Sequence, residues 1–129
     1  MFGKLARSLS VLAIAAFLVP CAQADAFRPP AVPLVTVDPY TSVWSFSDHL
    51  YDSWPVHWTG QVHAMAGIVR VDGEPYRFMG PEAVCPQVAR QTSLTVRPTT
   101  TVYTFEAGEV ELRVEFTTPM LPSDLSLLA

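Results

Sequence analysis

Residues 109–116 (EVELRVEF) constrain the fold of this chain more than any other stretch, because charged and apolar side chains alternate at every position. A repeat of two residues places successive side chains on opposite faces of a β-strand, so the pattern predicts a strand with one buried and one solvated face. The expected inward set is Val110, Leu112, Val114 and Phe116, and the expected outward set is Glu109, Glu111, Arg113 and Glu115.

The stretches before this strand also indicate β-structure. Residues 100–106 (TTVYTFE) are rich in the β-branched and aromatic residues that strands favour, and Ala107-Gly108 supplies a turn between the two strands. Residues 92–97 form a third predicted strand, ended by Pro98. Together these segments predict an all-β fold, an antiparallel sandwich-like arrangement built from hairpins.

A second hairpin is predicted at Asp72-Gly73, because a type I′ turn needs positive φ at both central positions and this dipeptide tolerates it. Residues 74–79 are the expected return strand. The preceding residues 61–71 fit either a strand interrupted at Gly67 or a short helical turn that leads into one. Residues 80–90, with two prolines, are predicted to form a loop.

Two shorter strands are predicted nearer the N-terminus, at residues 34–37 and 40–47. In the second strand, the alternation places the side chains of one face inward and so puts Trp44 in the core. That expected inward face is made of Tyr40, Ser42, Trp44 and Phe46.

Residues 1–24 have the features of a signal peptide: a short basic region, an apolar run over residues 9–19, and a small-x-small motif ending at Ala24. Cleavage after Ala24 predicts a secreted or periplasmic protein. A retained membrane anchor is the alternative, although the apolar run is short for a span of about 30 Å. Residues 25–33 then form a proline-rich extended entry, and residues 34–129 the β-rich domain.

The charge of the mature chain disfavours several classes of partner. Loss of Lys4 and Arg7 with the signal peptide leaves six arginines against 12 acidic residues, a net charge of −6. Because no basic stripe is available to neutralise phosphates, nucleic-acid binding is not expected, nor is a membrane partner after cleavage. Cys21 also leaves with the signal peptide, so Cys85 has no intrachain cysteine partner.

Residues 38–61 concentrate the side chains that could carry chemistry: Trp44, Trp54, Trp58, His49, His57, Asp48 and Asp52. The spacings between His49, His57 and His63 match no helical pair or compact ligand loop, so neither a metal nor another cofactor is predicted. Cys85 and the glutamates of residues 109–115 are predicted to be structural or solvated rather than catalytic. Trp54, His57 and Trp58 lie in irregular chain. For the two tryptophans, packing in the core is one alternative, and a contact at a substrate rim or with another domain, shared with His57, is the other.

The C-terminal end of the sequence exposes Leu125, Leu127 and Leu128 without a closing element, so we expect an N-terminal fragment of a longer protein. The strand at residues 109–116 has no predicted partner other than residues 100–106. An unpaired edge of this kind is an aggregation liability.

Motifs along the whole mature segment resemble the start of the glutaminase A-like family of secreted fungal and bacterial proteins. They are Arg28-Pro29-Pro30, Asp38-Pro39-Tyr40, His57-Trp58-Thr59-Gly60, Ile68-Val69-Arg70-Val71-Asp72-Gly73, Phe78-Met79-Gly80, Gln91-Thr92-Ser93 and Tyr103-Thr104-Phe105-Glu106-Ala107-Gly108. The resemblance implies a β-rich N-terminal region followed by an α-helical toroid that carries the hydrolysis of glutamine to glutamate and ammonia. No catalytic residue can be transferred onto this chain, because the toroid lies beyond it.

Three readings of function follow from these observations. The first is a non-catalytic β module of an exported glutaminase-like amidohydrolase, packed on downstream domains of the same polypeptide and inactive alone. The second is a carbohydrate-binding or accessory module whose tryptophans stack on sugars, so a small-molecule amide and a glycan both remain candidate ligands. The third is an inert truncated product.

Overall fold

The computed structural model describes residues 28–118, which form seven β-strands and no helix. The strands are β1 (Val32–Thr36), β2 (Ser42–Ser45), β3 (Gly67–Val71), β4 (Glu74–Met79), β5 (Arg90–Val96), β6 (Thr100–Ala107) and β7 (Val110–Thr117). All pairings between them are antiparallel, which confirms the all-β antiparallel prediction. The predicted signal peptide, its cut after Ala24 and the C-terminal leucines lie outside the described residues. No helix in the described part is long and apolar enough to cross a membrane.

The strands β5, β6 and β7 form a three-stranded sheet with β6 at its centre. The turn between β6 and β7 is formed by Gly108 and Glu109, one residue later than predicted, and Gly108 has a φ of 61°. Leu112, Val114 and Phe116 pack against the core as the alternation predicted. The inward prediction for Val110 is wrong: its side chain is 45% exposed, because it follows the turn at the end of an edge strand.

The hairpin β3–β4 turns at Asp72-Gly73 as predicted. Asp72 and Gly73 have φ values of 50° and 88°, the left-handed conformation that a type I′ turn requires at both positions. The strand β3 begins at Gly67, and residues 61–66 contain one isolated bridge and no helical turn. Of the two alternatives for residues 61–71, the strand is therefore correct for residues 67–71, and the helical turn is wrong.

The hairpin β1–β2 is extended by a loop that follows it. Trp44 and Val56 exchange two backbone hydrogen bonds, of 2.8 and 2.9 Å, and Val56 bridges in turn to Val62. This short ladder holds the irregular residues 48–63 against β2.

The predicted inward face of residues 40–47 is wrong. Tyr40 and Phe46 are exposed and Trp44 is only half-buried, whereas Val43, from the opposite face, belongs to the core. The regular strand is only four residues long, and Tyr40 precedes it in a turn held by Asp38. Because Ser42, Val43 and Ser45 are all buried, β2 is covered on both faces and alternation does not apply to it.

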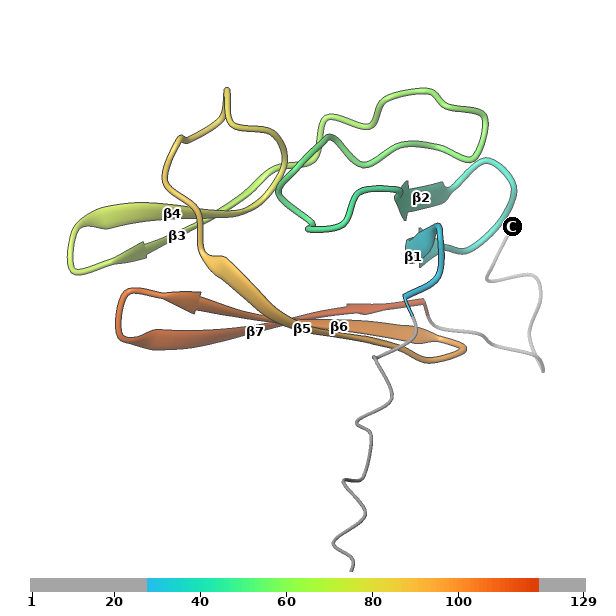
Figure 1. Ribbon diagram of the computed structural model, residues 1–129. Coiled ribbons are helices and arrows are strands. Elements are labelled where there is room, and N and C mark those ends of the chain that lie inside the picture. The colour runs from blue at the N-terminus through green and yellow to red at the C-terminus, as the bar shows by residue number, and fades with distance from the viewer. Residues whose placement is uncertain (1–27, 119–129) are drawn as a thin grey trace, which may run out of the picture.

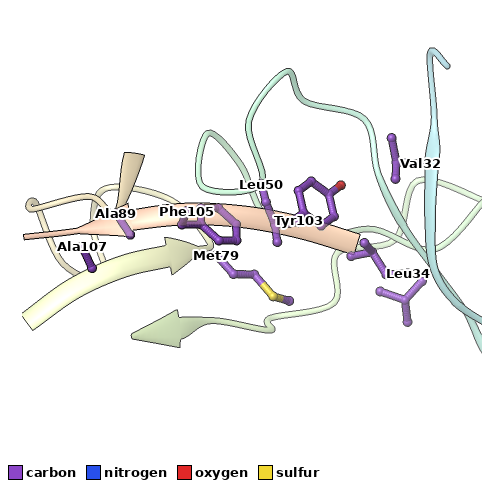
Figure 2. Packing of buried hydrophobic residues seen from close by; sticks show 9 residues of the cluster. Val32, Leu34, Leu50, Met79, Ala89, Tyr103, Phe105 and Ala107 are labelled. Carbon is purple, nitrogen blue, oxygen red and sulfur yellow. The ribbon is translucent and has the colours of Figure 1, made fainter. Parts of the chain in front are cut away.

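The two hairpins lie on the same side of the three-stranded sheet, and the core fills the space between the layers (Figure 1). Figure 2 shows its members converging from both layers. The buried cluster consists of Val32, Leu34, Val43, Leu50, Met79, Ala89, Tyr103, Phe105 and Ala107. The rings of Phe78 and Phe105 join the layers, with centroids 5.8 Å apart.

The chain passes from one layer to the other just before β5. The amide of Arg77 donates to the carbonyl of Gln87 at 2.8 Å, and the amide of Ala89 donates to the carbonyl of Arg77 at 2.9 Å. Residues 87–89 therefore run beside β4, in parallel, and then continue into the three-stranded sheet as β5. This connection makes one continuous core of the two layers.

Candidate interdomain contact site

Asp38 shapes the first segment of the candidate site. Its Oδ1 accepts hydrogen bonds from the backbone amides of Tyr40 and Thr41, both at 2.7 Å, in the pattern of an Asx turn. These two backbone donors lower the pKa of the Asp38 carboxyl below its ordinary value, because they stabilise the charged form. The turn fixes Pro39 and presents Tyr40 to solvent, where its side chain is 90% exposed.

A tight loop shapes the second segment. The amide of His57 donates to the carbonyl of Gln61 at 2.7 Å, and the amide of Gly60 donates to the carbonyl of His57 at 2.8 Å. Gly60 has a φ of 89°, which a residue with a Cβ adopts only under strain. The bridge between Val56 and Val62 closes the base of this loop, so Trp58 lies near its tip.

The two segments meet at the carbonyl oxygen of Pro39. It accepts a hydrogen bond from His57 Nε2 at 2.9 Å and another from Trp58 Nε1 at 2.8 Å. Because a carbonyl oxygen can only accept, His57 carries its proton on Nε2. Its Nδ1 then accepts from the Thr59 amide at 3.3 Å and lies 2.8 Å from the Thr59 hydroxyl. Every polar atom of the imidazole is thus used in holding the loop.

We name Tyr40, His57 and Trp58 the aromatic corner. Trp58 is 60% exposed although its indole nitrogen is bonded, and Val62 beside the loop is half exposed. His57 is half-buried and contacts Trp58 with ring centroids 5.4 Å apart. The result is a largely apolar surface in which the imidazole of His57 and the indole N–H of Trp58 already have hydrogen-bond partners.

Of the three predicted site residues, the structure brings His57 and Trp58 together. Trp54 is half-buried and shares none of the hydrogen bonds or ring contacts that join those two within residues 28–118. The rings of His63 and His57 meet edge to face with centroids 5.9 Å apart, and Nε2 of His63 is buried without a hydrogen-bond partner among residues 28–118.

The remaining candidate groups are dispersed. His49 binds the Asp52 carboxylate through its amide at 2.8 Å and its Nδ1 at 3.0 Å, within a local turn. Cys85 is buried, with its Sγ 3.6 Å from the carbonyl oxygen of Gln87. Within the described part of the chain, no group of three or more His, Cys, Asp or Glu side chains is placed to hold a metal ion.

Three residues of importance were not found from the sequence. The alternation pattern places Tyr40 on a buried face and gives no role to Pro39, although the Asp38-Pro39 pair is a signal for an Asx turn that exposes Tyr40. Arg77 lies in the predicted return strand at residues 74–79, where an arginine is expected to face solvent, yet it is only 3% exposed. Nothing local to Arg77 in the sequence signals this burial, because its acceptors are the backbone carbonyls of Tyr51, Gly80 and Cys85, and main-chain oxygens carry no sequence signal.

Comparison with known proteins gives a consistent result. Residues 8–88 match a family described as Domain of unknown function (DUF4964), a match that ends two residues before β5. The chain is also similar to Glutaminase A of Aspergillus oryzae (strain ATCC 42149 / RIB 40), with 36% identity over 133 residues. That alignment covers 97% of this chain but only 19% of the relative's length. No solved structure matches the chain significantly.

Proposed function

This chain belongs to the DUF4964 family and resembles the N-terminal region of glutaminase A, and from that premise we propose that it is a non-catalytic β module of an exported glutaminase-like amidohydrolase. The module would pack on downstream domains of the same polypeptide, which would carry the hydrolysis of glutamine to glutamate and ammonia. The similarity to 19% of a curated glutaminase supports this role, since most of that protein lies outside the aligned region.

The aromatic corner is the observation that supports docking. Large, rigid aromatic side chains with few rotatable bonds contribute contact area at low entropic cost, which is why Trp and Tyr are frequent at interfaces. In Trp58 the indole N–H is already bonded to Pro39, so the exposed ring face can be buried without leaving a polar group unpaired. Trp54, nearby in sequence and half-buried, would lie at the margin of the same contact.

The test is a Trp58→Ala substitution in the full-length protein. We expect a single thermal unfolding transition to separate into two, as the β module loses its contact with the remaining domains. Ile68→Ala on β3 is the matched control, because Ile68 is also about half exposed and lies outside the aromatic corner. An unchanged single transition in the Trp58 variant would contradict the docking role.

Export is part of the proposal. The basic, apolar and small-residue regions of residues 1–24 support cleavage after Ala24 and a secreted or periplasmic location. Sequencing the N-terminus of the mature protein tests this directly. A chain that begins at Asp25 would agree, and a chain that keeps residues 1–24 would not.

Carbohydrate binding is the second candidate function, because Tyr40 and Trp58 present exposed aromatic rings that could stack on sugars. Titration of the protein with oligosaccharides, followed by tryptophan fluorescence, separates the two functions. A saturable change that Trp58→Ala abolishes would favour glycan binding. If tryptophan fluorescence does not change on addition of oligosaccharides, the interdomain role is favoured over glycan binding.

A further inference from the structure

The outer edge of β7 is unpaired among residues 28–118, because β7 ends the sheet order β5-β6-β7. The register shows which backbone groups lie on that edge. With a two-residue turn at 108–109, Ala107 and Val110 form the first hydrogen-bonded pair, and hydrogen-bonded pairs then recur at every second residue. The amides and carbonyls of Glu111, Arg113 and Glu115 therefore point away from β6.

This edge lacks three of the features that protect free edges. Natural edge strands are often short, bulged or interrupted by proline, and others carry charged side chains, as β7 does at Glu111, Arg113 and Glu115. β7 has eight residues and no proline, and its register with β6 runs without a shift from Thr117 to Val110. The other strand pairings, β1–β2, β3–β4 and β5–β6, each contain a register irregularity.

One charged side chain on β7, Glu111, has no oppositely charged partner among the described residues. Glu111 lies directly opposite Glu106 on β6, an arrangement that destabilises an antiparallel pair. Glu106 is bound to Arg90 on β5, and Arg113 is bound to Glu115. Glu111 forms no ion pair within the described residues, so the side of β7 away from β6 favours a basic side chain beside it.

We propose that a β-strand from the longer polypeptide, outside residues 28–118, pairs with the outer edge of β7. It would place an arginine or lysine beside Glu111 and apolar side chains beside Leu112 and Val114, which are only half-buried in the described structure. The occupant belongs to the same polypeptide because the similar glutaminase is about five times longer than its aligned part, and a tethered strand has a high effective concentration.

This inference shares with the proposed function the premise that further domains follow, but it uses a different surface. The aromatic corner lies on loops beside β2, whereas β7 belongs to the other layer (Figure 1). The two proposals can therefore fail separately. If Trp58→Ala has no effect on domain docking, the edge of β7 can still be paired with another strand. If the edge of β7 is unpaired, the aromatic corner can still be buried against another domain.

Residue-resolved hydrogen exchange on the full-length protein is the primary test. The amides of Glu111, Arg113 and Glu115 donate no hydrogen bond to β6, so an open edge lets them exchange at nearly the rate of an unstructured chain. Pairing predicts exchange slower by about 100-fold or more. Unprotected amides at these three positions would overturn the proposal. Protection that appears only at high protein concentration, with dimer formation, would also overturn it, since the partner would be a second copy.

A second test compares two proline variants. Arg113→Pro removes an amide that points outward and spares the ladder with β6. Val96→Pro is the control on the opposite edge, because Arg97 and Thr100 form a hydrogen-bonded pair and Val96 therefore points away from β6. We expect Arg113→Pro to lower the Tm of the full-length protein by about 5 °C more than either Val96→Pro or Arg113→Ala. Equal shifts in the two proline variants would contradict pairing at β7, and the exchange experiment on the unmodified protein decides the matter if a variant does not fold.

Discussion

The indole Nε1 of Trp58 donates a hydrogen bond of 2.8 Å to the carbonyl oxygen of Pro39, a residue nineteen positions earlier in the chain. The same oxygen accepts from His57 Nε2, so two loops that are distant in sequence are joined at one atom. The bond orients the indole and satisfies its only polar group, while 60% of the side chain stays exposed. In the proposed docking role, this arrangement would lower the entropic cost of contact, because the indole is already oriented before a partner binds.

His57→Ala tests how much this junction stabilises the loop. The substitution removes the bond to Pro39 and leaves the Thr59 amide without its acceptor, so we expect a loss of about 1–2 kcal/mol in the free energy of unfolding. Urea unfolding followed by tryptophan fluorescence measures it. His49→Ala is the control, because the side chain of His49 is hydrogen-bonded to Asp52, three residues away. An equal loss in the free energy of unfolding in both variants would show that the bond to Pro39 stabilises the protein no more than a local hydrogen bond does.

Arg77→Met tests the buried guanidinium. In the folded chain the Nε of Arg77 donates to the carbonyl of Cys85 at 2.6 Å, and its Nη1 donates to the carbonyls of Tyr51 and Gly80. Methionine leaves these acceptors without a donor, so we expect a loss of about 3 kcal/mol in the free energy of unfolding. Arg70→Met, at an exposed position on β3, should cost less than about 0.5 kcal/mol. Midpoints of urea unfolding compare the two.

Gly67→Ala tests the packing between layers. A Cβ at this position would overlap the ring of Phe78, which packs on Phe105 and cannot move freely. We expect a loss of about 1–3 kcal/mol in stability, from displacement of the ring. Gly60→Ala is the contrasting variant, since open space surrounds its Cβ position and only backbone strain of about 1 kcal/mol is expected. Thermal unfolding that ranks the two variants in the opposite order would refute this account of the core.

Alkaline unfolding should report on Tyr103. Burial raises the pKa of its hydroxyl to about 12 from an ordinary value of 10.0, with opposing contributions from the Ser45 hydrogen bond and the charge of Arg28. Because the folded state holds the proton more tightly, this contribution to stability is complete below pH 10 and is lost as the pH rises toward 12. In the Tyr103→Phe variant, the free energy of unfolding should depend less on pH between pH 10 and 12 than in the unsubstituted protein. A profile that falls equally in both proteins would assign the effect to other groups.

The sequence predicted the strands whose patterns are local. Strict alternation identified β7, and Asp72-Gly73 identified the β3–β4 hairpin, because a strand face and a type I′ turn depend on neighbouring residues. The prediction for residues 40–47 was wrong because β2 is covered on both faces, which depends on segments far away in the chain.

The candidate site was predictable only in part. The concentration of aromatic residues in irregular chain led to His57 and Trp58, and both prove to be in one hydrogen-bonded arrangement. Their shared acceptor, the Pro39 carbonyl, could not be foreseen, because backbone carbonyls carry no sequence signal. The buried role of Arg77 was hidden for the same reason, since its three acceptors are main-chain oxygens.

The most direct test of a non-catalytic, docking role is the rate of ammonia release from glutamine by the full-length protein carrying His57→Ala and Trp58→Ala together. At a temperature well below unfolding, we predict a kcat within about twofold of the unsubstituted enzyme, because neither side chain would touch the reacting atoms, and a clear fall in the Tm. A kcat reduced by about 100-fold or more, with the Tm unchanged, would place these residues in the reaction itself and contradict the account.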